Sequence, residues 1–315
     1  MLDRFTSMTV FARVASLASF SAAARELGLS QTMVTKHVNA LERRLNTRLL
    51  NRSTRRLSLT DAGRDFLEAC TRLLLEIEEA EAAITEDRSQ PRGMLRLNAP
   101  VSFGTREIAP LLADFAAEAP QVSVDLGLND RLIDLVEEGW DLAIRIGSLK
   151  SSALIAKRLA PCRTLVCAAP RYLAEHGTPT RVEELEEHNC LSYTLSTVVG
   201  HRRWTFGRRR ERMAAVSGNL QANNGDALVA AAIRGQGIIY QPTFLVADAV
   251  RSGALVPLTL DEPPIEIDGI YAVYAPGQRV PERVRAFIDF LAQRFTPVPP
   301  WDRGLDAAGR SAGGF

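Results

Sequence analysis

Four polar side chains between positions 31 and 36 carry groups that proteins use to read the edges of base pairs. They offer a carboxamide, two hydroxyls and an ammonium group, on Gln31, Thr32, Thr35 and Lys36. A glutamine amide pairs with adenine through two hydrogen bonds, and a threonine methyl contacts thymine. This spacing therefore predicts contacts with double-stranded DNA. Gln31 is the first candidate for base readout, with positioning on a phosphate as its alternative.

The residues before this set follow the pattern of two short helices joined by a tight turn. Gly28 stands where the chain reverses, because glycine adopts a positive φ without steric cost. Ala23 and Ala24 are small enough for a second helix to pack closely, and the Ser30 hydroxyl can cap that helix. In a helix-turn-helix, the early turns of the second helix enter the major groove. An ordinary helical hairpin with a solvated polar face is the alternative, since short patterns also arise by chance.

A basic segment follows the second helix and is predicted to form a wing beside it. Leu57 and Leu59 alternate with polar residues, as in a short half-buried strand, and arginines precede them. These arginines would lie on phosphates or enter the minor groove, and serine hydroxyls would add hydrogen bonds to the DNA backbone. The further candidate DNA contacts are Ser21, Ser30, Arg52, Thr54, Arg55 and Arg56.

Charge is distributed unevenly along the chain. Residues 1–60 hold ten Lys/Arg and three Asp/Glu, a net charge of +7, whereas residues 61–90 carry −6 and the remainder is neutral. The overall net charge of +1 therefore conceals a basic head. Positive charge gathered in one small module is the electrostatic signature of a phosphate-binding surface.

Two longer helical patterns flank this head. Residues 2–17 place apolar side chains at every third position. A second pattern begins at Thr60, a candidate N-cap, and its apolar stripe comprises Ala62, Phe66, Ala69, Leu73, Ile77, Ala80 and Ile84. This helix either packs on its own domain or pairs with a second copy of the chain. The small head offers little surface to cover it, so the pattern favours a homodimer.

Length and composition indicate a globular protein of about two domains. The chain has 315 residues, of which 46% are hydrophobic and 24% are charged. No stretch approaches the ~20 apolar residues of a membrane span. The N-terminus lacks a basic region followed by an apolar core, which argues against secretion and for a cytoplasmic location.

The residues that could support catalysis or bind a metal are scattered. The four histidines form no cluster, and neither a nucleophile elbow, a P-loop nor a zinc-protease motif occurs. Four cysteines at uneven spacings disfavour a zinc site and a disulfide framework. We therefore predict no enzymatic activity, no metal and no cofactor. The cysteines indicate buried thiols in a reducing compartment, with a redox sensor at Cys162, Cys167 or Cys190 as the alternative.

The second part of the chain reads as alternating strands and helices. Pro91 and Gly93 interrupt the long helical pattern and indicate a linker over 87–93. Beyond it, alternation of the two element types predicts α/β layers. Strands are expected at 94–98, 122–126, 141–146, 163–169, 237–240 and 271–274. Helices are expected at 107–118, 132–138, 227–234, 243–251 and 281–295.

The winged helix-turn-helix, the long helix and the α/β remainder together resemble the LysR-type transcriptional regulators. In the first half, the resemblance rests on the motifs Phe20–Gln31, Leu41–Glu42 and Arg52–Gly63. The motifs of the second half look like the large subgroup typified by regulators of small organic acid metabolism, and they are Asn223–Ala227, Gly235–Gly237 and Gly253–Pro257. Many relatives have Thr where this chain has Ser53, a mild change that leaves the predicted wing in place.

The resemblance implies an α/β effector domain with two lobes like those of periplasmic binding proteins. It assigns 1–60 to a winged helix-turn-helix DNA-binding domain, 61–90 to a linker and dimerisation helix, and 91–297 to the effector domain. Lobe I would comprise 91–162 and 266–297, and lobe II 163–265, with the chain crossing near 160–163 and 263–267. Residues 298–315 are expected to form a disordered tail. Family members are usually dimers of dimers that bind imperfect inverted repeats and respond to a small co-inducer, so a homodimer or homotetramer is expected.

The implied effector cleft draws on both lobes. Residues 100–105 join a strand to a helix, where hydroxyls and backbone N–H groups could hold an anion, and in the family this position lines the cleft. The candidate effector contacts are Ser102, Phe103, Thr105, Arg145, Asn224, Asp226 and Gln241. A carboxylate-bearing metabolite is the expected effector. Asp226 has an alternative role as an acid at a helix start, and Arg145 and Gln241 have structural alternatives.

Two further alternatives remain open. A solute-binding protein of a transport system would share the two-lobed domain, although the basic head and the lack of a signal peptide argue against it. The arginine-rich run 201–212 reads as a hairpin with Trp204 and Phe206 on one side. Its arginines form either a solvated basic turn or an extra contact with DNA or a partner.

Overall fold

The computed structural model describes residues 3–52, 57–82, 90–131, 133–149, 153–196, 198–276 and 280–305. The chain divides into two compact units, Met1–Ser89 and Gln90–Phe315. Each unit is built around its own hydrophobic core. The helix-turn-helix of the first unit and the α/β architecture of the second agree with the fold class expected from the sequence.

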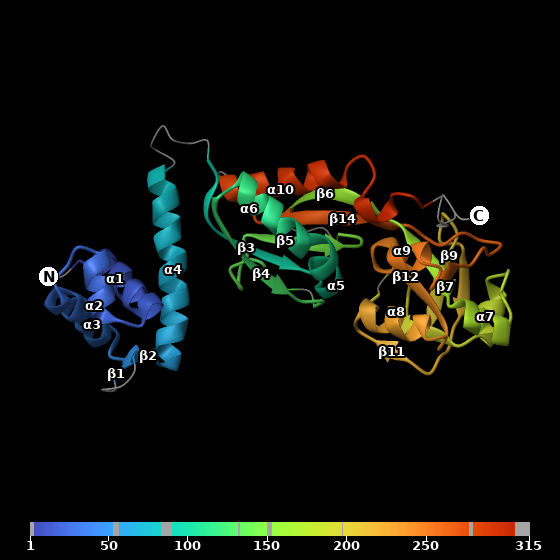
Figure 1. The fold of residues 1–315 in the computed structure, drawn as a ribbon, viewed down its shortest axis with the longest axis horizontal. Helices are drawn as coiled ribbons and strands as arrows, with labels where there is room; N and C mark the ends of the chain where they lie inside the picture. Colours follow the sequence, from blue (N-terminus) through green and yellow to red (C-terminus); the bar gives the residue numbers. More distant parts are fainter. Residues whose placement is uncertain are drawn as a thin grey trace. The chain divides into compact units, whose positions relative to one another are not determined.

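The first unit contains a helix-turn-helix, a two-stranded wing and a long helix (Figure 1). Its elements are α1 (Arg4–Leu17), α2 (Phe20–Glu26), α3 (Gln31–Leu45), β1 (Leu50–Arg52), β2 (Leu57–Leu59) and α4 (Asp61–Ala82). The side chains of Asp3, Ser19 and Ser30 each accept a backbone N–H at the start of the helix that follows. Gly28 has a φ of +64° in the turn between α2 and α3. The local signals in the sequence thus produce the predicted motif.

One apolar core joins these helices. Phe11 and Val14 of α1 and Val34 and Val38 of α3 are fully buried. The centroid of the Phe66 ring of α4 lies 5.7 Å from the centroid of the Phe11 ring. Burial of one such side chain contributes roughly 1.5–3 kcal/mol relative to its exposure. The core therefore fixes which face of α3 points inward and which face meets solvent.

The apolar stripe of α4 is covered over only part of its length. In the first half of the helix, Phe66 packs on Phe11 and Cys70 is fully buried. In the second half, Leu73 and Ile77 remain 40% and 38% exposed. The helix therefore packs on its own domain at one end and leaves apolar surface uncovered at the other.

In the second unit, the first sheet and its helices form what we call lobe I. The strand order is β4-β3-β5-β14-β6, with β3 parallel to β4 and β5, and β14 antiparallel to β5 and β6. Helices α6 (Leu112–Glu118) and α10 (Glu282–Phe295) pack together through Phe115 and Phe287, whose ring centroids lie 4.8 Å apart. The strands are β3 (Arg92–Ala99), β4 (Gln121–Leu128), β5 (Leu142–Ile146), β6 (Ile155–Cys162) and β14 (Ile267–Tyr274).

The second sheet and its helices form lobe II, in the strand order β11-β8-β12-β7-β13. Its strands are β7 (Thr164–Ala168), β8 (Cys190–Tyr193), β11 (Gln221–Ala222), β12 (Ile238–Pro242) and β13 (Val256–Pro257). Its helices are α7 (Pro170–His176), α8 (Gly225–Ile233) and α9 (Thr243–Arg251), and α9 has the bounds expected from the sequence. A separate antiparallel pair, β9 (Arg203–Phe206) and β10 (Arg212–Ala215), forms the hairpin expected in the arginine-rich run, and Trp204 and Phe206 are buried.

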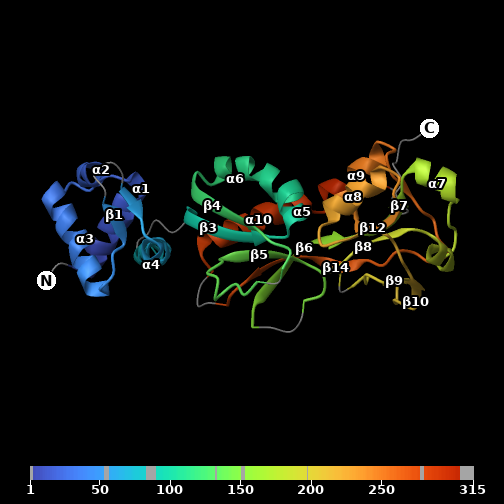
Figure 2. The same ribbon diagram turned by 90° about the horizontal axis from the view of Figure 1, so that it is seen from below.

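The chain passes between the lobes in two adjacent segments. Strand β6 ends at Cys162 in lobe I, and β7 begins at Thr164 in lobe II. The chain returns at the start of β14, where Ile267 pairs with Cys162 (Figure 2). These are the segments in which the resemblance places the two crossings. Because only two neighbouring segments join the two sheets, this geometry permits hinge motion between the lobes.

The helix expected at 132–138 is wrong, because residues 133–134 have no regular structure and 135–139 form a turn. Asp134 Oδ1 accepts two backbone N–H groups within this segment, at 2.9 and 3.1 Å. Such a local side-chain bond offers the backbone an alternative to a helix. Arg96 then holds the end of the segment by donating to the carbonyls of Glu138 and Gly139, at 3.3 and 3.1 Å.

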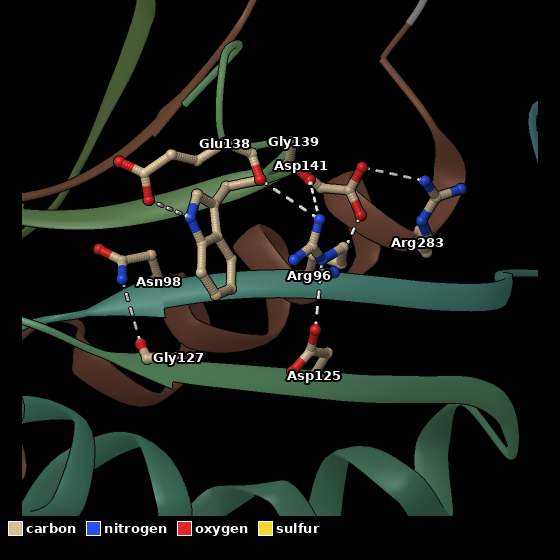
Figure 3. A network of polar contacts seen from close by, with 9 residues as sticks. Arg96, Asn98, Asp125, Gly127, Glu138, Gly139, Asp141 and Arg283 are labelled. Carbon is tan, nitrogen blue, oxygen red and sulfur yellow. Dashed lines mark hydrogen bonds and ion pairs between the residues drawn. The ribbon is translucent and has the colours of Figure 1, made fainter. Parts of the chain in front are cut away.

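Arg96 is the centre of a wider polar network on lobe I (Figure 3). Its Nε lies 3.2 Å from Asp125 on β4, and its backbone N–H donates to Asp141 at 2.9 Å. Asp141 also accepts from Arg283 of α10, at 3.1 Å. The Arg96 guanidinium lies 4.9 Å from the centroid of the Trp140 ring. Contacts between residues far apart in sequence thus fix this segment, and periodicity does not reveal them.

The helix expected at 107–118 begins later than predicted. The chain winds as a short α-helix over Val101–Phe103, a π-turn over Gly104–Ile108 and a 3-10 turn over Ala109–Leu111 before α6 begins at Leu112. Pro110 has no backbone N–H to donate, so a regular α-helical ladder cannot run through it. Wide turns of this kind often mark functional positions.

The disordered tail expected over 298–315 is wrong for its first part. A 3-10 turn spans Pro300–Asp302, and Trp301 is only 4% exposed. The centroid of the Trp301 ring lies 5.1 Å from that of Phe295 and 5.5 Å from that of Phe103. Burial of this one large ring anchors the segment despite its high content of proline. Residues 306–315 lie outside the described part of the chain.

Candidate nucleic-acid interface and effector cavity

The first turns of α3 present the predicted DNA-reading side chains. Gln31, Thr32 and Lys36 are exposed, and Thr35 is half-buried. The Thr35 hydroxyl donates to the Gln31 carbonyl at 2.9 Å, so its hydrogen is used within the helix. Ser30 Oγ accepts the N–H of Met33 at 3.2 Å and caps α3. The helix therefore offers an amide, a free hydroxyl and an ammonium group from a rigid start.

A buried polar pair sets the rotation of α3 against α1. His37 is 4% exposed, and its Nδ1 lies 2.9 Å from Ser7 Oγ. The Ser7 hydroxyl also donates to the Asp3 carbonyl at 2.7 Å, so it links His37 to the start of α1. A buried pair of this kind is costly to break, because either partner alone would lose its hydrogen bond. Sequence reasoning missed both residues, since they lie 30 positions apart.

The far end of α3 is also basic. Glu42 accepts the backbone N–H groups of Leu49 and Leu50, at 3.0 and 3.1 Å, and so fixes the turn toward the wing. A shallow hollow at this turn is lined by Lys36, Asn39, Glu42, Arg43, Asn46, Thr47 and Arg48. Arg43 and Arg48 are exposed and were not among the predicted contacts. Arginine forks suit phosphate oxygens, and these two extend the basic surface beyond Lys36.

The wing is described only at its two strands. The strand that the alternating pattern predicts at Leu57–Leu59 is present and pairs antiparallel with Leu50–Arg52. The candidate contacts Thr54, Arg55 and Arg56, like the side chain of Arg52, lie outside the described part of the structure. Ser21 is exposed on α2, with its Oγ 3.1 Å from Ser19 Oγ.

A cavity of about 260 Å³ lies between lobes I and II. Most of its wall is apolar or aromatic, contributed from lobe II by Tyr193, Leu195, Trp204, Tyr240, Phe244 and Leu245, and from lobe I by Phe103 and Ile146. Besides the polar atoms of Tyr193, Trp204 and Tyr240, the hydrogen-bonding side chains in the wall are Ser102, Asp130, Ser148, Ser196 and Gln241. An apolar wall with a few polar groups is the usual character of a small-molecule site.

Three of the seven predicted effector residues line this cavity: Ser102, Phe103 and Gln241. Thr105 is exposed and lies outside the wall. Arg145 also lies outside it, since its Nη2 donates to the Ile133 carbonyl at 2.7 Å, and burial lowers the pKa of its guanidinium. Arg145 thus has the structural role that was its alternative.

Asn224 and Asp226 lie beside the cavity and connect the lobes. Asn224 caps α8 by accepting the Ala227 N–H at 3.2 Å, and its Nδ2 lies 3.5 Å from Ser102 Oγ of lobe I. Asp226 forms an ion pair with Arg106 of the π-turn, at 2.7 Å. Both side chains of this pair are about one-third exposed, at 38% and 34%. Sequence reasoning missed Arg106, because its partner is 120 residues away.

Gln241 is the most enclosed polar group of the wall. Its side chain is 2% exposed, and its Nε2 has no hydrogen-bond partner among the described residues. A Cβ on Gly225 would lie 2.4 Å from Leu245 and 3.2 Å from Gln241 Oε1, so the start of α8 packs tightly against this amide. An unpaired buried donor costs about 1–3 kcal/mol, which a ligand acceptor would recover.

Asp130 is the one charged side chain among the described residues that line the cavity. Its Oδ1 accepts the Val101 N–H at 2.9 Å. Burial, aided by the Asp130 charge, raises the pKa of Tyr193 to about 12, so that phenol stays a neutral donor. Sequence reasoning missed Asp130, although its place just beyond β4 is a usual position for a ligand contact.

All four cysteines are buried and unpaired. Burial raises the pKa of Cys70 to about 11 and the pKa of Cys167 and Cys190 to about 12, and it raises that of Cys162 as well. Thiolates react with oxidants far faster than thiols, so these values argue against the alternative of a redox sensor.

Neither a metal-binding cluster nor a membrane-spanning helix is found among the described residues. No group of three or more His, Cys, Asp or Glu side chains in this part of the chain is placed to hold a metal ion. No helix among the described residues is long and apolar enough to cross a membrane.

Comparisons with known proteins match both units. The model of the bacterial regulatory helix-turn-helix protein, lysR family, matches residues 5–64, and the model of the LysR substrate binding domain matches 88–296. An HTH-type transcriptional regulator of Xanthomonas campestris pv. campestris is 38% identical over 288 residues, which cover 90% of this chain and 83% of the relative. An HTH-type transcriptional repressor of Pseudomonas aeruginosa is 34% identical, covering 95% of this chain and 94% of the relative.

Solved structures show the same likeness over the full chain. CrgA, a LysR-type transcriptional regulator from Neisseria meningitidis, has a TM-score of 0.59 at 33% identity, and the match covers 91% of this chain and 97% of CrgA. Full-length AphB from Vibrio cholerae has a TM-score of 0.57 at 28% identity, covering 91% and 98%. These relatives are transcriptional regulators. The capped recognition helix, the two-lobed second unit and both family models lead to one conclusion: the chain belongs to the LysR family of bacterial transcriptional regulators.

Proposed function

We propose that this regulator acts in the cytoplasm, where it binds double-stranded DNA as an oligomer and responds to a small effector held between lobes I and II. The observation that carries the proposal is the rigid start of α3, which presents Gln31, Thr32 and Lys36 to solvent. A capped helix with an amide and an ammonium group on its first turns suits the major groove.

Gln31 is the proposed base reader. Its amide would form two hydrogen bonds with adenine, while Thr32 and the methyl of Thr35 would contact thymine or a phosphate. Lys36 would reach a base or the backbone. The proposed contacts with the DNA backbone are Ser21, Ser30, Arg43, Arg48, Arg52, Thr54, Arg55 and Arg56.

Gln31→Ala tests the base reader in a mobility-shift assay with DNA from the region upstream of the protein's own gene. We expect binding to a specific fragment to weaken by about 5- to 150-fold, the equivalent of ~1–3 kcal/mol, with little change for unrelated DNA. Gln121→Ala, an exposed glutamine of the second unit, is the matched control. Equal losses on both kinds of DNA would make Gln31 a phosphate contact instead.

The basic side chains are tested by the salt dependence of binding. Replacing Arg55 and Arg56 together with Ala should weaken binding to all sequences and lower the slope of log affinity against log salt by ~0.9 for each lost phosphate contact. An unchanged slope would refute their role on phosphates. No binding to any fragment at low ionic strength would refute the DNA-binding function altogether.

A carboxylate-bearing effector is proposed for the cavity. The Gln241 Nε2 donor and the Ser102 hydroxyl would bind its oxygens, and the aromatic wall would cover its apolar part. Titration of the full chain with organic and aromatic acids, followed by tryptophan fluorescence, tests this, because Trp204 is part of the wall. Failure of every acid to bind would count against the proposal.

Oligomer formation is proposed through α4. Its exposed Leu73 and Ile77 continue the apolar stripe that, at Phe66, packs inside the head. A second copy of α4 would cover these side chains, and the resulting dimer would present two heads to the two halves of an inverted repeat. Homodimer and homotetramer are both compatible with this surface.

A further inference from the structure

The polar groups in the wall of the interlobe cavity differ in kind from one another. One is a buried amide that lacks an acceptor, and another is a carboxylate that lacks a counter-charge in the wall. We infer that the effector carries an ammonium group that pairs with Asp130, together with an acceptor for Gln241, on an apolar body. The inference rests on the proposal that this cavity is the effector site and names the chemical class that it takes: an apolar α-amino acid or a close analogue.

Gln241 defines the acceptor end of the ligand. Its Nε2 has no partner among the described residues although the side chain is 2% exposed. The residue sits on β12 in register with Leu165, and the close approach of Gly225 leaves the amide little freedom to turn away. A ligand carboxylate would accept from Nε2, and its second oxygen would reach the Ser102 hydroxyl across the cavity wall.

Asp130 defines the donor end. Val101 occupies one of its oxygens, and no hydrogen bond to the other is found among the described residues. No Lys, Arg or His side chain appears among the described residues of the wall, so nothing there offsets the Asp130 charge. An acid without a donor would bring a second negative charge into this enclosure, where like charges repel strongly. An ammonium group relieves the imbalance by pairing with Asp130.

The rest of the wall sets the size and polarity of the ligand body. A volume of about 260 Å³ is the share of roughly nine water molecules in the liquid. Four aromatic side chains line the cavity: Phe103, Trp204, Tyr240 and Phe244. A branched aliphatic or a phenyl side chain would be desolvated here, whereas a second charge in the ligand body would find no partner in the described wall.

The test uses probes that differ in one group. Three probes share a phenyl body. L-phenylalanine carries both a carboxylate and an amine, 3-phenylpropionate carries the carboxylate alone, and phenethylamine carries the amine alone. L-leucine and 4-methylpentanoate form a second pair. Binding to the full chain is followed by calorimetry and tryptophan fluorescence. We expect each amino acid to bind at least about ten-fold tighter than the acid that lacks the amine, the equivalent of one additional charged hydrogen bond.

Asp130→Asn is the decisive variant, because its amide oxygen can still accept from Val101. It should weaken amino-acid and amine binding by about ten- to a hundred-fold and leave the plain acids unchanged or tighter. Asp114→Asn, an exposed acid on α6, is the control for a change in net charge alone. Gln241→Leu should weaken the acids and amino acids alike and leave phenethylamine bound.

Two results would overturn the inference. One is tighter binding of the plain acids than of the amino acids, with no effect of Asp130→Asn. The other is no binding of either amino acid at concentrations up to about 1 mM, where the free energy of binding is only about −4 kcal/mol. Both leave the mobility shift with DNA intact, whereas failure of the proposed function would appear as loss of that shift. The two failures are therefore distinguishable.

Discussion

Replacing Glu107 with Gln should stabilise the second unit at neutral pH. Glu107 lies in the π-turn beside Arg106, and burial raises the pKa of its carboxyl from 4.5 to about 7, with the Asp248 carboxylate adding to the rise. The folded protein therefore keeps a proton that the unfolded chain releases. Because the folded state binds more protons over this interval, stability falls as pH rises from about 4.5 to 7.

The size of the effect follows from the pKa. A rise from 4.5 to about 7 corresponds to about 3 kcal/mol at most. Part of the Glu107 side chain meets solvent, which screens the charge and reduces the expected effect to about 1–2 kcal/mol. Glu107→Gln keeps the shape of the side chain and cannot ionise. It should match the wild type near pH 4.5 and exceed it by that amount above pH 7.

Urea unfolding followed by tryptophan fluorescence measures this effect in the full chain. All three tryptophans, Trp140, Trp204 and Trp301, lie in the second unit, so the signal reports that unit alone. Glu137→Gln, an exposed acid in the same lobe, serves as the control. Parallel stability–pH curves for the wild type and Glu107→Gln would refute the reasoning.

Three more predictions concern contacts described above. Arg106→Ala and Asp226→Ala should show a coupling of about 0.5–1 kcal/mol in a double-mutant cycle by urea unfolding, and additive effects would contradict an interlobe ion pair. Ser7→Ala should lower the free energy of unfolding of the head by about 1–3 kcal/mol, followed by far-UV circular dichroism, because it removes the hydrogen-bond partner of His37. An effect no larger than that of Ser16→Ala, at an exposed serine, would contradict this. Leu73→Glu should shift the protein toward smaller species in sedimentation velocity, and an unchanged distribution would remove α4 from the interface.

The sequence predicts elements whose signals are local. Gly28 supplies a positive φ and Ser30 caps the helix that follows, so these two residues locate the turn of the helix-turn-helix. The predicted range of α9 is correct, because its apolar residues, the proline before its first turn and the arginine at its end all indicate the same bounds. Both effects act within a few residues, which is the range over which a single sequence can be interpreted.

The sequence does not predict contacts between distant segments. Asp134 and Arg96 override the helical pattern at 132–138, and Trp301 orders a segment whose composition suggests disorder. Of the predicted effector residues, Ser102, Phe103 and Gln241 line the cavity, and the first two were predicted because they follow a strand that leads into a helix. The sequence does not reveal Arg106, whose partner Asp226 lies in the other lobe. It also does not reveal Asp130, whose partner Val101 lies in a neighbouring segment.

The burial of all four cysteines has a practical consequence for measuring motion in this molecule. A thiolate is the nucleophile that attacks a maleimide reagent, and the raised pKa values keep the buried native thiols protonated. New cysteines placed on exposed positions, such as Asp114 of lobe I and Arg234 of lobe II, would therefore take up a spin label or a dye selectively in the otherwise native chain. The spacing between two such labels would report opening and closing of the lobes directly.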